Sequence, residues 1–552
     1  MDLLNSALKE YKIWLDNTKE DKHIQEELSV LENSPEELLE CFGGDLSFGT
    51  SGIRGLLGPG PRRINSYVVA RATQGLSDYI NSLRSKGEAK GRVVVGYDTR
   101  LFSKEFALRT AEVLSGNGIE AFVFSETTPV SVLSYSIGEL DCDYGIMITA
   151  SHNAGVFNGY KVYNRYGYQI VGEEPKEILD AINSHDFFSN IKSSNDNITY
   201  LDSKLKESFL NKAHEVVSEF MNIEGKEELS IVYTPLNGTG RDYVKELLDR
   251  VGFTQVHSVP VQDKPDHNFT TCKAPNPEKL SAYSEAFRKL DEVEGDIIIA
   301  TDPDSDRMGV ALVHEGTKIN LTGNQIALLM LDFLCSIKAP KSGQKIYRSV
   351  VTSPLLDRVA ESYGLEVETT LIGFKHIGKA IENMMTIDEM DKFYFGAEES
   401  NGFLIDPFLR DKDGITSSAI IAAVAALQKK NGLDLVDKLN EIYDDFGALI
   451  DKSKSFTFQG LSGEETINEI MHYLRNEMSD QIGDLYIEDK TDYLQDDTGL
   501  SPSNIIRFDM DDGSTAIIRP SGTEPKVKVY MFLTDPISSI DKGITELMER
   551  FK

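Results

Sequence analysis

The sequence predicts an α/β protein of four domains, in which three similar mixed α/β domains precede a C-terminal α+β domain. Three observations predict it. The chain has 552 residues, which is too long for one hydrophobic core and suits about three to five domains. One pattern of strand, helix and strand recurs three times along the chain. The last hundred residues or so follow a different pattern.

Each repeat has a strand rich in β-branched residues, then a loop, an amphipathic helix, a glycine and a second strand. The repeats cover residues 92–126, 229–259 and 345–371. The glycine that closes each helix suits a left-handed C-cap. Strands and helices that alternate in this way are typical of βαβ units in mostly parallel sheets.

The C-terminal region predicts an α+β module. Residues 505–519 indicate a hairpin that turns at Asp-Asp-Gly, a strand follows over 526–533, and a last helix ends the chain. We place domain boundaries near Tyr200, Asn320 and Gly447. The predicted domains are residues 1–200, 201–320, 321–447 and 448–552. The first forty residues predict extra helices laid on the first domain.

Composition and charge exclude several classes of function. The longest apolar run, Ala419 to Leu427, is far shorter than the roughly 20 residues of a membrane span. The N-terminus lacks a signal-peptide core, so we expect a cytoplasmic protein. Four widely spaced cysteines argue against a disulfide framework and a zinc site. A net charge of -32 opposes binding to nucleic acid and anionic lipid. A cationic partner is an alternative to a solvated acidic surface, and an anionic substrate would need a locally basic cleft.

A loop with alternating carboxylates predicts a metal site. Asp302, Asp304 and Asp306 lie between two apolar segments that read as strands. Three hard oxygen ligands suit Mg²⁺ or Mn²⁺. A calcium EF-hand does not fit, because Arg307 stands where that motif needs glycine and Val313 where it needs glutamate. A solvated acidic turn is the alternative interpretation.

A second loop presents a serine where a strand ends. The apolar segment that ends at Ile148 leads into Thr-Ala-Ser151-His152-Asn, and the carboxyl end of a strand is where open α/β sheets usually place their chemistry. The loop is not a hydrolase elbow, and a histidine adjacent in sequence indicates no triad. Lys161, on the next predicted strand, could reach the same cleft. Local turn hydrogen bonds are the alternative explanation.

Three further loops suit anions or sugars. The planar guanidinium of Arg519 could bind two phosphate oxygens, and the segment after it, Ser521-Gly522-Thr523, offers hydroxyl and N–H groups. The alternative is that this segment is an ordinary turn between two strands. Glu398 and Ser400, in the loop 396–402, suit sugar hydroxyls but also ordinary exposed loops. Arg54 lies among glycines in the loop 47–55. Neither a P-loop nor a dinucleotide fingerprint supports nucleotide use.

Together these loops resemble the α-D-phosphohexomutase superfamily, most closely its phosphoglucomutase and phosphomannomutase members. TASHN resembles the phosphoserine loop, DPDSDR the metal loop, GAEESNG the sugar loop and RPSGTEP the phosphate loop. The resemblance covers nearly the whole chain, in the family's order, with one loop per predicted domain. It implies four domains around a central cleft.

The resemblance also implies a role for each loop. Ser151 would carry a phosphoryl group and, with Asp302, Asp304 and Asp306, hold one Mg²⁺ per chain. Arg54 and Arg307 would steady the phosphoserine. The candidate general acids and bases are His152 and Lys161. The substrate-binding residues would be Glu398, Ser400, Gly373, Lys375, His376, Lys412, Arg519, Ser521, Gly522 and Thr523.

The implied function is a phosphoglucomutase that interconverts glucose 1-phosphate and glucose 6-phosphate through a phosphoserine, with glucose 1,6-bisphosphate as bound intermediate and primer. The alternatives are mannose, pentose or glucosamine phosphate as substrate, a metal-dependent sugar phosphatase, and a non-catalytic metal-binding protein. Ile372 replaces a hydroxyl that glucose enzymes usually offer, and Thr234 to Gly238 resembles the branch with phosphopentomutase-like enzymes. We expect a monomer or dimer whose fourth domain rotates about a hinge near Gly447.

Overall fold

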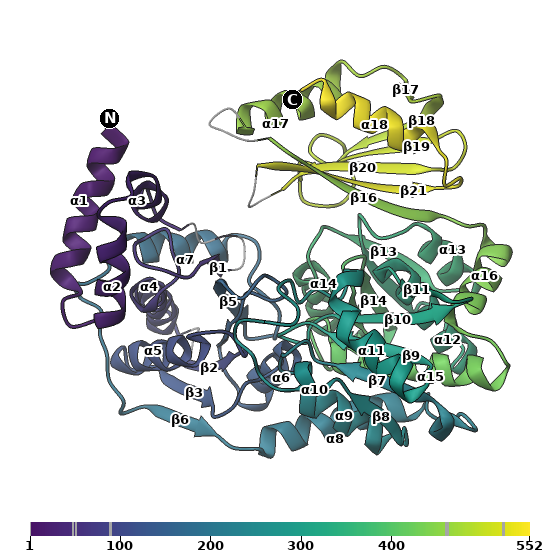
Figure 1. Cartoon of the computed structure of the whole chain (residues 1–552), viewed down its shortest axis with the longest axis horizontal. Coiled ribbons are helices and arrows are strands. Elements are labelled where there is room, and N and C mark those ends of the chain that lie inside the picture. Colours follow the sequence, from purple (N-terminus) through teal and green to yellow (C-terminus); the bar gives the residue numbers. More distant parts are fainter. Residues whose placement is uncertain are drawn as a thin grey trace.

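The computed structural model describes residues 2–46, 49, 52–87, 91–458, 463–521 and 525–551. These residues form four β-sheets, each covered by helices, in chain order. Figure 1 shows the first module at the N-terminal end, the second and third side by side, and the fourth above them. Four modules, three alike and one different, confirm the predicted fold class.

The first sheet has the strand order β1-β5-β4-β2-β3-β6, in which β2, β3, β4 and β6 are parallel and β5 and β1 run antiparallel. Helices cover it on both faces. The strands are β1 Gly52–Leu56, β2 Arg92–Tyr97, β3 Glu120–Phe124, β4 Tyr144–Ile148, β5 Phe157–Asn164 and β6 Ile198–Leu201. The helices are α4 Ser66–Ser85, α5 Ser103–Gly116, α6 Val130–Glu139 and α7 Glu174–Asn183.

Three N-terminal helices pack on the first module, as predicted. They are α1 Asp2–Asn17, α2 Lys22–Leu31 and α3 Pro35–Phe42. Trp14 of α1 is completely buried, and its ring lies edge-on to Phe42 of α3 and to Tyr67 and Phe188 of the first module. The aromatic cluster therefore fastens the helices to the domain.

The second sheet has the order β11-β10-β9-β7-β8, with β7, β8 and β9 parallel and β10 and β11 antiparallel. Its strands are β7 Ser230–Thr234, β8 Gln255–Ser258, β9 Ile297–Thr301, β10 Met308–His314 and β11 Thr317–Asn320. Its helices are α8 Lys204–Ser218, α9 Arg241–Arg250, α10 Pro260–Asp263 and α11 Ser284–Val293, with 3₁₀ turns Lys226–Glu228 and Leu280–Tyr283.

The third sheet has the order β13-β12-β14-β15, and only β15 is antiparallel. Its strands are β12 Lys345–Ser349, β13 Glu366–Thr370, β14 Phe393–Glu398 and β15 Gly402–Leu404. Its helices are α12 Gly323–Ile337, α13 Leu355–Ser362, α14 Lys375–Thr386, α15 Gly414–Lys430 and α16 Leu435–Phe446, with a 3₁₀ turn Met390–Lys392. The long apolar run of the sequence lies in α15, which packs on α9 and α12.

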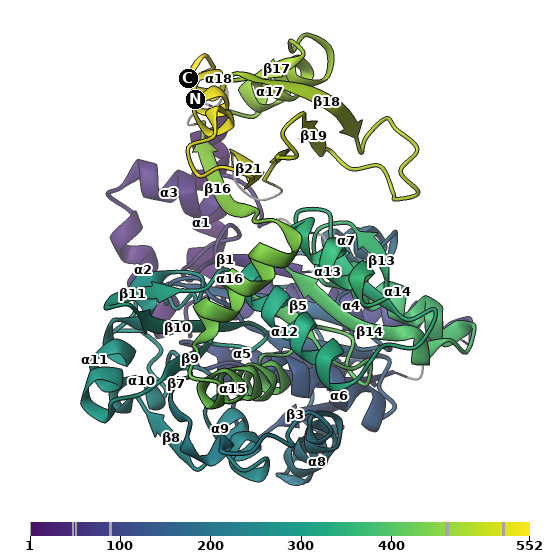
Figure 2. The same ribbon diagram turned by 90° about the vertical axis from the view of Figure 1, so that its right-hand side faces the viewer.

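The fourth sheet is antiparallel, in the order β16-β21-β20-β19-β18-β17. Its strands are β16 Ile450–Thr457, β17 Gln481–Ile482, β18 Leu485–Asp492, β19 Ile506–Met510, β20 Thr515–Pro520 and β21 Lys526–Leu533. Its helices are α17 Gly463–Asn476 and α18 Ser539–Glu549. Figures 1 and 2 both show β16 leading from α16 into this module.

The three predicted βαβ repeats are confirmed as β2-α5-β3, β7-α9-β8 and β12-α13-β13. Each helix is followed by a glycine in the left-handed region: φ is +75° at Gly118, +94° at Gly252 and +79° at Gly364. A left-handed residue at this point ends a helix, and glycine adopts it without steric cost.

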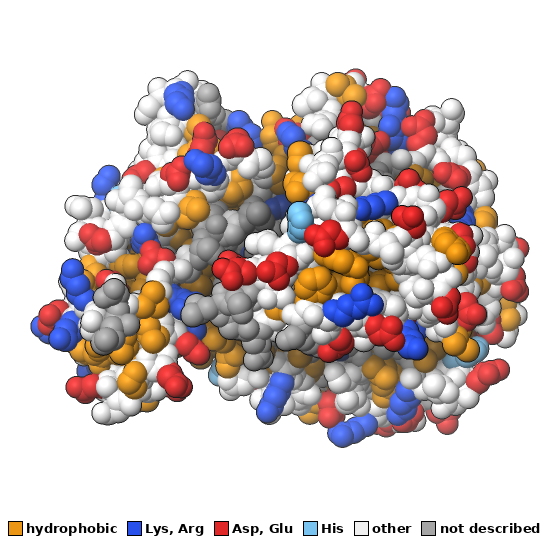
Figure 3. Space-filling model, turned by 90° about the horizontal axis from the view of Figure 1, so that it is seen from above, with side chains coloured by type: hydrophobic (Ala, Val, Ile, Leu, Met, Phe, Trp, Pro, Cys, Tyr) orange, Lys and Arg blue, Asp and Glu red, His pale blue; other side chains and the backbone are white. Residues whose placement is uncertain are grey.

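The cysteines and the charges agree with the composition. Cys41, Cys142, Cys272 and Cys335 are all buried and free. Figure 3 shows Asp and Glu side chains scattered over one face with Lys and Arg between them, rather than gathered in one patch. Within the described part of the chain, no helix is both long enough and apolar enough to cross a membrane.

Candidate active site

Elements of all four modules line one cavity of about 680 Å³. Ser151 follows β4, Asp306 follows β9, and Glu398 ends β14, so three of the lining groups lie where strands end. The fourth module contributes Arg519 from β20 and Lys528 from β21, which are paired across the two strands. Sequence positions as far apart as 151 and 519 therefore face the same space.

The cavity is basic although the protein is acidic. Its described acidic lining residues are Glu278, Asp306, Glu398, Glu399 and Asp451. Its described basic lining residues are Arg54, Lys161, Arg307, Lys375, Lys412, Lys452, Lys454, Arg519 and Lys528. The locally basic cleft that an anionic substrate would need is thus present.

Ser151 is buried beside the loop that carries Asp302, Asp304 and Asp306, which we call the acidic loop. Its Oγ donates a hydrogen bond to Asp302 Oδ2 at 2.9 Å and lies 3.3 Å from His152 Nδ1. Its backbone is left-handed, with φ of +52°, and its N–H donates to Thr149 Oγ1 at 2.8 Å. Burial lowers the pKa of His152 well below its usual value, and the neighbouring Arg307 adds to this effect, so the imidazole is neutral.

The three aspartates form one carboxylate cluster. Ligand oxygens of Asp302, Asp304 and Asp306 all lie within 4.8 Å of one another, and all three residues are buried. Burial, together with the charges of the other two aspartates, raises the pKa of Asp302 well above its usual value. Asp304 Oδ1 and Asp306 Oδ1 are buried without a hydrogen-bond partner. Buried carboxylate oxygens without a partner, in a cluster of this kind, fit a hard divalent cation.

Two lysines border this cluster. Lys161 Nζ of β5 donates to Asp304 Oδ2 at 2.8 Å, and Lys412 Nζ lies 3.1 Å from Asp306 Oδ2. Burial disfavours the charged form of Asp304, but its interactions with Lys161, Asp302 and Lys412 together outweigh this effect and lower the pKa of that carboxyl. Lys161 was predicted to reach the cleft, and it does.

The acidic loop is fastened by residues of all three α/β modules. Val130 N, at the start of α6, donates to Asp304 O at 2.9 Å, and Gly414 N donates to Ser305 O at 3.0 Å. A Cβ on Gly414 would lie 2.8 Å from that carbonyl oxygen, and a Cβ on Gly238 would lie 2.4 Å from Pro303 Cα. The segment Thr234 to Gly238 is therefore a close-packed support for the loop.

The loop at 396–402 is tied to its neighbours. Glu398 Oε1 accepts a hydrogen bond from Gly373 N at 2.9 Å, where φ of +108° favours glycine. Burial raises the pKa of Glu398 to about 7, although Lys412 opposes the shift. Asn401 exchanges two 3.1 Å hydrogen bonds with the backbone of Met308, which joins this loop to β10. Ser400 lines the cavity.

The segment from Ile372 to His376 is only partly in the cavity. Ile372, Gly373 and Lys375 line it, whereas His376 is not among its described lining residues. Burial lowers the pKa of Lys375 to about 8. Burial and the adjacent Lys375 lower the pKa of His376 to about 4.

The fourth module presents cations. Arg519 Nη2 donates to Tyr530 OH at 3.2 Å, and Arg519 Nε is buried without a hydrogen-bond partner. Burial and Arg519 lower the pKa of Lys528. Ser521 donates its N–H to Lys526 O at 2.7 Å and is not among the described lining residues. Gly522 and Thr523 lie outside the described residues.

The two predicted arginines, Arg54 and Arg307, both line the cavity. Arg54 of β1 donates from Nη1 to Asn153 Oδ1 at 3.1 Å, although most of its predicted loop (47, 48, 50 and 51) lies outside the described residues. Arg307 donates from Nη1 to Glu278 Oε1 at 2.5 Å. Glu278 lines the cavity and was missed from the sequence, where nothing marks it out.

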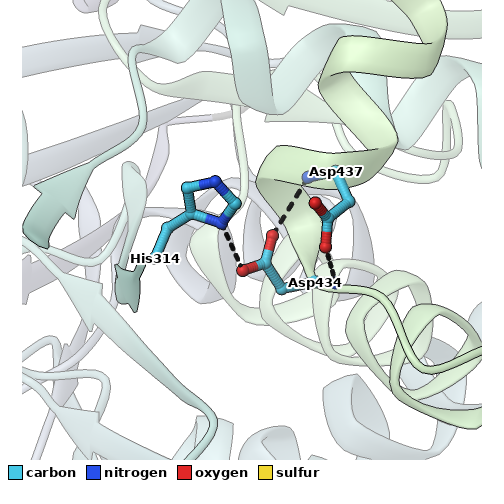
Figure 4. Close-up of side chains that lie close together, drawn as sticks. All are labelled: His314, Asp434 and Asp437. Atoms are coloured by element: carbon cyan, nitrogen blue, oxygen red, sulfur yellow. Dashed lines mark hydrogen bonds and ion pairs between the residues drawn. The ribbon is translucent and has the colours of Figure 1, made fainter. Parts of the chain in front are cut away.

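A second cluster of potential metal ligands has a structural explanation (Figure 4). Asp434 Oδ1 accepts from the N–H groups of Val436 and Asp437 and caps α16, while Asp437 Oδ2 accepts from Asp434 N. The other Asp434 oxygen lies 2.7 Å from His314 Nδ1. The cluster is a capping box with an ion pair, and its residues are not among the described residues that line the cavity.

Comparison with known proteins places the chain among sugar-phosphate mutases. Four domain models of phosphoglucomutase/phosphomannomutase match: alpha/beta/alpha domains I, II and III over residues 45–189, 207–315 and 322–445, and the C-terminal domain over 477–531.

Relatives match along most of their length. A phosphoglucomutase of Staphylococcus haemolyticus is 35% identical, over 89% of this chain and 91% of that protein. A phosphoglucomutase of Staphylococcus saprophyticus is 33% identical, over 97% of this chain and 98% of that protein. A solved structure from Thermus thermophilus, described as a phosphomannomutase, shares the fold with a TM-score of 0.71 and 21% identity, over 92% of this chain and 99% of that one.

Proposed function

Because the chain belongs to the phosphoglucomutase/phosphomannomutase family, we propose that it interconverts glucose 1-phosphate and glucose 6-phosphate with Ser151 as phosphoryl carrier. The observation that carries the proposal is the position of the Ser151 hydroxyl, 2.9 Å from Asp302 in a basic cavity. The Staphylococcus relatives, which are named phosphoglucomutase, favour glucose over mannose or pentose phosphate.

The reaction would start from phosphorylated Ser151. The P–O bond to Ser151 Oγ breaks, and a new P–O bond forms to the free hydroxyl of a bound sugar monophosphate. The proton of that hydroxyl goes to a base in the cavity, and Ser151 Oγ takes up a proton as its P–O bond breaks, which restores the serine hydroxyl. The resulting sugar 1,6-bisphosphate turns over and returns its other phosphoryl group to Ser151, so phosphate is neither gained nor lost.

His152 and Lys161 are the two candidates for acid–base work, and the geometry favours His152 as the proton acceptor. The neutral His152 ring lies 3.3 Å from Ser151 Oγ and can accept a proton at Nδ1. Lys161, held by Asp304 at 2.8 Å, can place positive charge beside the transferring group. Arg54 and Arg307, which also line the cavity, can hold the remaining oxygens of the phosphoryl group.

A divalent ion fits the carboxylate cluster. We infer that Asp302, Asp304 and Asp306, with an oxygen of phosphorylated Ser151, hold one Mg²⁺ per chain. When bound, the ion would neutralise charge on the phosphoryl group. The unpaired oxygens of Asp304 and Asp306 support this assignment, because buried carboxylate oxygens without partners are costly.

Other groups that line the cavity suit the rest of the substrate. Glu398 and Ser400 would hold sugar hydroxyls, and Gly373 shapes that site by donating its N–H to Glu398. Lys375 and Lys412 line the same cavity as Glu398. Arg519 would grip the phosphate that does not react. His376, Ser521, Gly522 and Thr523 remain predictions as substrate ligands.

We also infer that the domains meet near Tyr200, Asn320 and Gly447, and that the fourth turns about Gly447. This glycine has φ of +83° and separates α16 from β16. In the position seen, Arg358 Nη1 donates to Phe446 O at 3.1 Å beside it. Solution scattering with and without substrate tests the rotation, and identical curves would count against it.

A coupled assay tests the activity. The protein is mixed with glucose 1-phosphate, Mg²⁺ and a trace of glucose 1,6-bisphosphate, and glucose 6-phosphate and free phosphate are recorded together. Fast glucose 6-phosphate with little free phosphate is expected. Free phosphate as the main product would establish a phosphatase instead. Turnover of mannose or pentose 1-phosphate alone would overturn the glucose preference.

A further inference from the structure

A buried ion pair lies behind the Ser151 loop, outside the residues that line the cavity. Asp98 and Arg100 follow β2, and Arg100 Nε donates to Asp98 Oδ2 at 3.0 Å. Both side chains are completely inaccessible to solvent. A buried arginine is rare unless its donors are satisfied, so its partners show what it holds.

The guanidinium of Arg100 contacts four backbone carbonyls of a single loop. Its Nη1 donates to Ala154 O at 2.8 Å and to Phe157 O at 3.1 Å. Its Nη2 donates to Asn153 O at 2.6 Å and to Ser151 O. The buried guanidinium therefore fixes the backbone of residues 151–157. A lysine ammonium, a point charge on a flexible stem, could not make these contacts together.

Asp98 links the arginine to the start of the same loop. Its Oδ2 accepts from Thr149 Oγ1 at 2.7 Å, and its Oδ1 accepts from Ser103 Oγ at 2.7 Å and from Arg100 N at 3.0 Å. Thr149 Oγ1 in turn accepts from Ser151 N. The two charged residues thus clamp the backbone on both sides of Ser151.

The backbone that Asp98 and Arg100 hold includes a strained residue, Ser151. Ser151 has φ of +52°, a region that non-glycine residues adopt only when their surroundings impose it. In this conformation its Oγ reaches Asp302 at 2.9 Å. A displacement of about 1 Å between reacting groups can cost roughly a hundredfold in rate. Accurate placement of this loop is therefore a requirement of the chemistry.

We propose that Arg100, oriented by Asp98, is a positioning residue that holds the Ser151 loop in its reactive conformation. The proposal rests on the function proposed above in assigning the reaction to Ser151. Because Arg100 does not line the cavity, its loss should lower kcat and leave KM for the sugar phosphate nearly unchanged. A role in stability alone would lower the melting temperature and leave kcat per folded molecule intact.

The test compares Arg100→Lys with a matched control, Arg475→Lys. Arg475 also forms a mostly buried pair, Nε to Asp492 Oδ2 at 2.9 Å, but in the fourth module. We expect Arg100→Lys to lower kcat by about a hundredfold or more, with KM within about threefold of wild type. Phosphorylation of Ser151 by glucose 1,6-bisphosphate, followed by intact mass, should slow by a similar factor. The control should change neither.

Two further measurements keep the test decisive. Amide hydrogen exchange of residues 151–157 should be faster in Arg100→Lys than in wild type and unchanged in Arg475→Lys, whatever activity the enzyme has. If Arg100→Lys does not fold, Asp98→Asn replaces it, because this variant keeps the Arg100 guanidinium. It should also lower kcat and speed amide exchange of residues 151–157, with a smaller fall in kcat than Arg100→Lys. Unchanged kcat and exchange would overturn the proposal. A wild-type enzyme without mutase activity but with the exchange difference would overturn the proposed function and not the clamp.

Discussion

Ser151 and Asp302 stand 151 positions apart in the chain, and a 2.9 Å hydrogen bond joins their side chains. Each lies just beyond the carboxyl end of a strand, β4 in the first sheet and β9 in the second. The contact places the hydroxyl of Ser151 beside the carboxylate cluster. A phosphoryl group on that oxygen would meet the cluster directly, as a metal-assisted transfer requires.

Ser151→Ala should abolish turnover. Without the hydroxyl no phosphoserine can form, so the coupled assay should show a loss of at least about a thousandfold. Stability should fall by only about 1 kcal/mol, the worth of one hydrogen bond. Ser134→Ala, a buried serine in α6 that bonds Gly167 O, serves as control and should keep full activity. Near-normal activity of Ser151→Ala would contradict the mechanism.

Asp302→Asn should remove the response to Mg²⁺. In the wild-type protein, millimolar Mg²⁺ should raise the melting temperature, because a ligand that binds only the folded state stabilises it. The variant relieves repulsion between carboxylates, so without metal it should be at least as stable as wild type. Asp332→Asn, at a buried aspartate bonded to Tyr363 OH, should retain the shift. An equal Mg²⁺ shift in Asp302→Asn would place the ion elsewhere.

Ile372→Thr should improve the use of glucose 1-phosphate. Ile372 lines the cavity where the resemblance implies a hydroxyl in glucose enzymes. One added hydrogen bond is worth about 1 kcal/mol, so kcat/KM should rise by up to about fivefold. Ile372→Val changes the shape without adding a hydroxyl and should bring no gain. A gain in both variants would show that space, not hydrogen bonding, governs the sugar.

Asp451→Asn should flatten a pH dependence of stability. Thr322 Oγ1 donates to Asp451 Oδ2 at 2.7 Å and joins the third module to β16, and burial raises the pKa of Asp451 from 3.8 to about 6. The folded protein therefore keeps this proton at pH values where the unfolded chain has lost it. Its contribution to stability is full at low pH and declines as pH rises from about 4 to about 6. Urea unfolding of both proteins at several pH values checks this, and parallel curves would contradict it.

Trp14→Ala should loosen the N-terminal helices. The side chain is fully buried among Phe42, Tyr67, Phe187 and Phe188. Truncating a buried tryptophan costs about 3–5 kcal/mol. Limited proteolysis should cut α1 to α3 sooner, whereas Ile13→Ala, at an exposed site on the same helix, should resemble wild type. Equal cleavage of the two variants would show that the cluster does not fasten the helices.

Local patterns predicted much of the fold and of the site. Alternating strands and helices with their closing glycines are short-range signals, and they predicted the βαβ repeats correctly. The carboxylate spacing predicted the Asp302 cluster for the same reason. Glu278 and Asp451 could not be predicted, since each enters the cavity from a segment with no distinctive pattern.

By itself, the sequence determined the α/β class, the order of the modules and the family, and it singled out Ser151 and the aspartates as candidates, because these depend on residue types within a few positions of one another. Only the tertiary structure decided which groups meet. The close packing of Gly238 and Gly414 on the acidic loop, the bond from Ser151 to Asp302, and the Arg100 clamp join segments far apart in the chain. Such contacts arise when packed modules exclude water and leave buried polar groups no partners but one another.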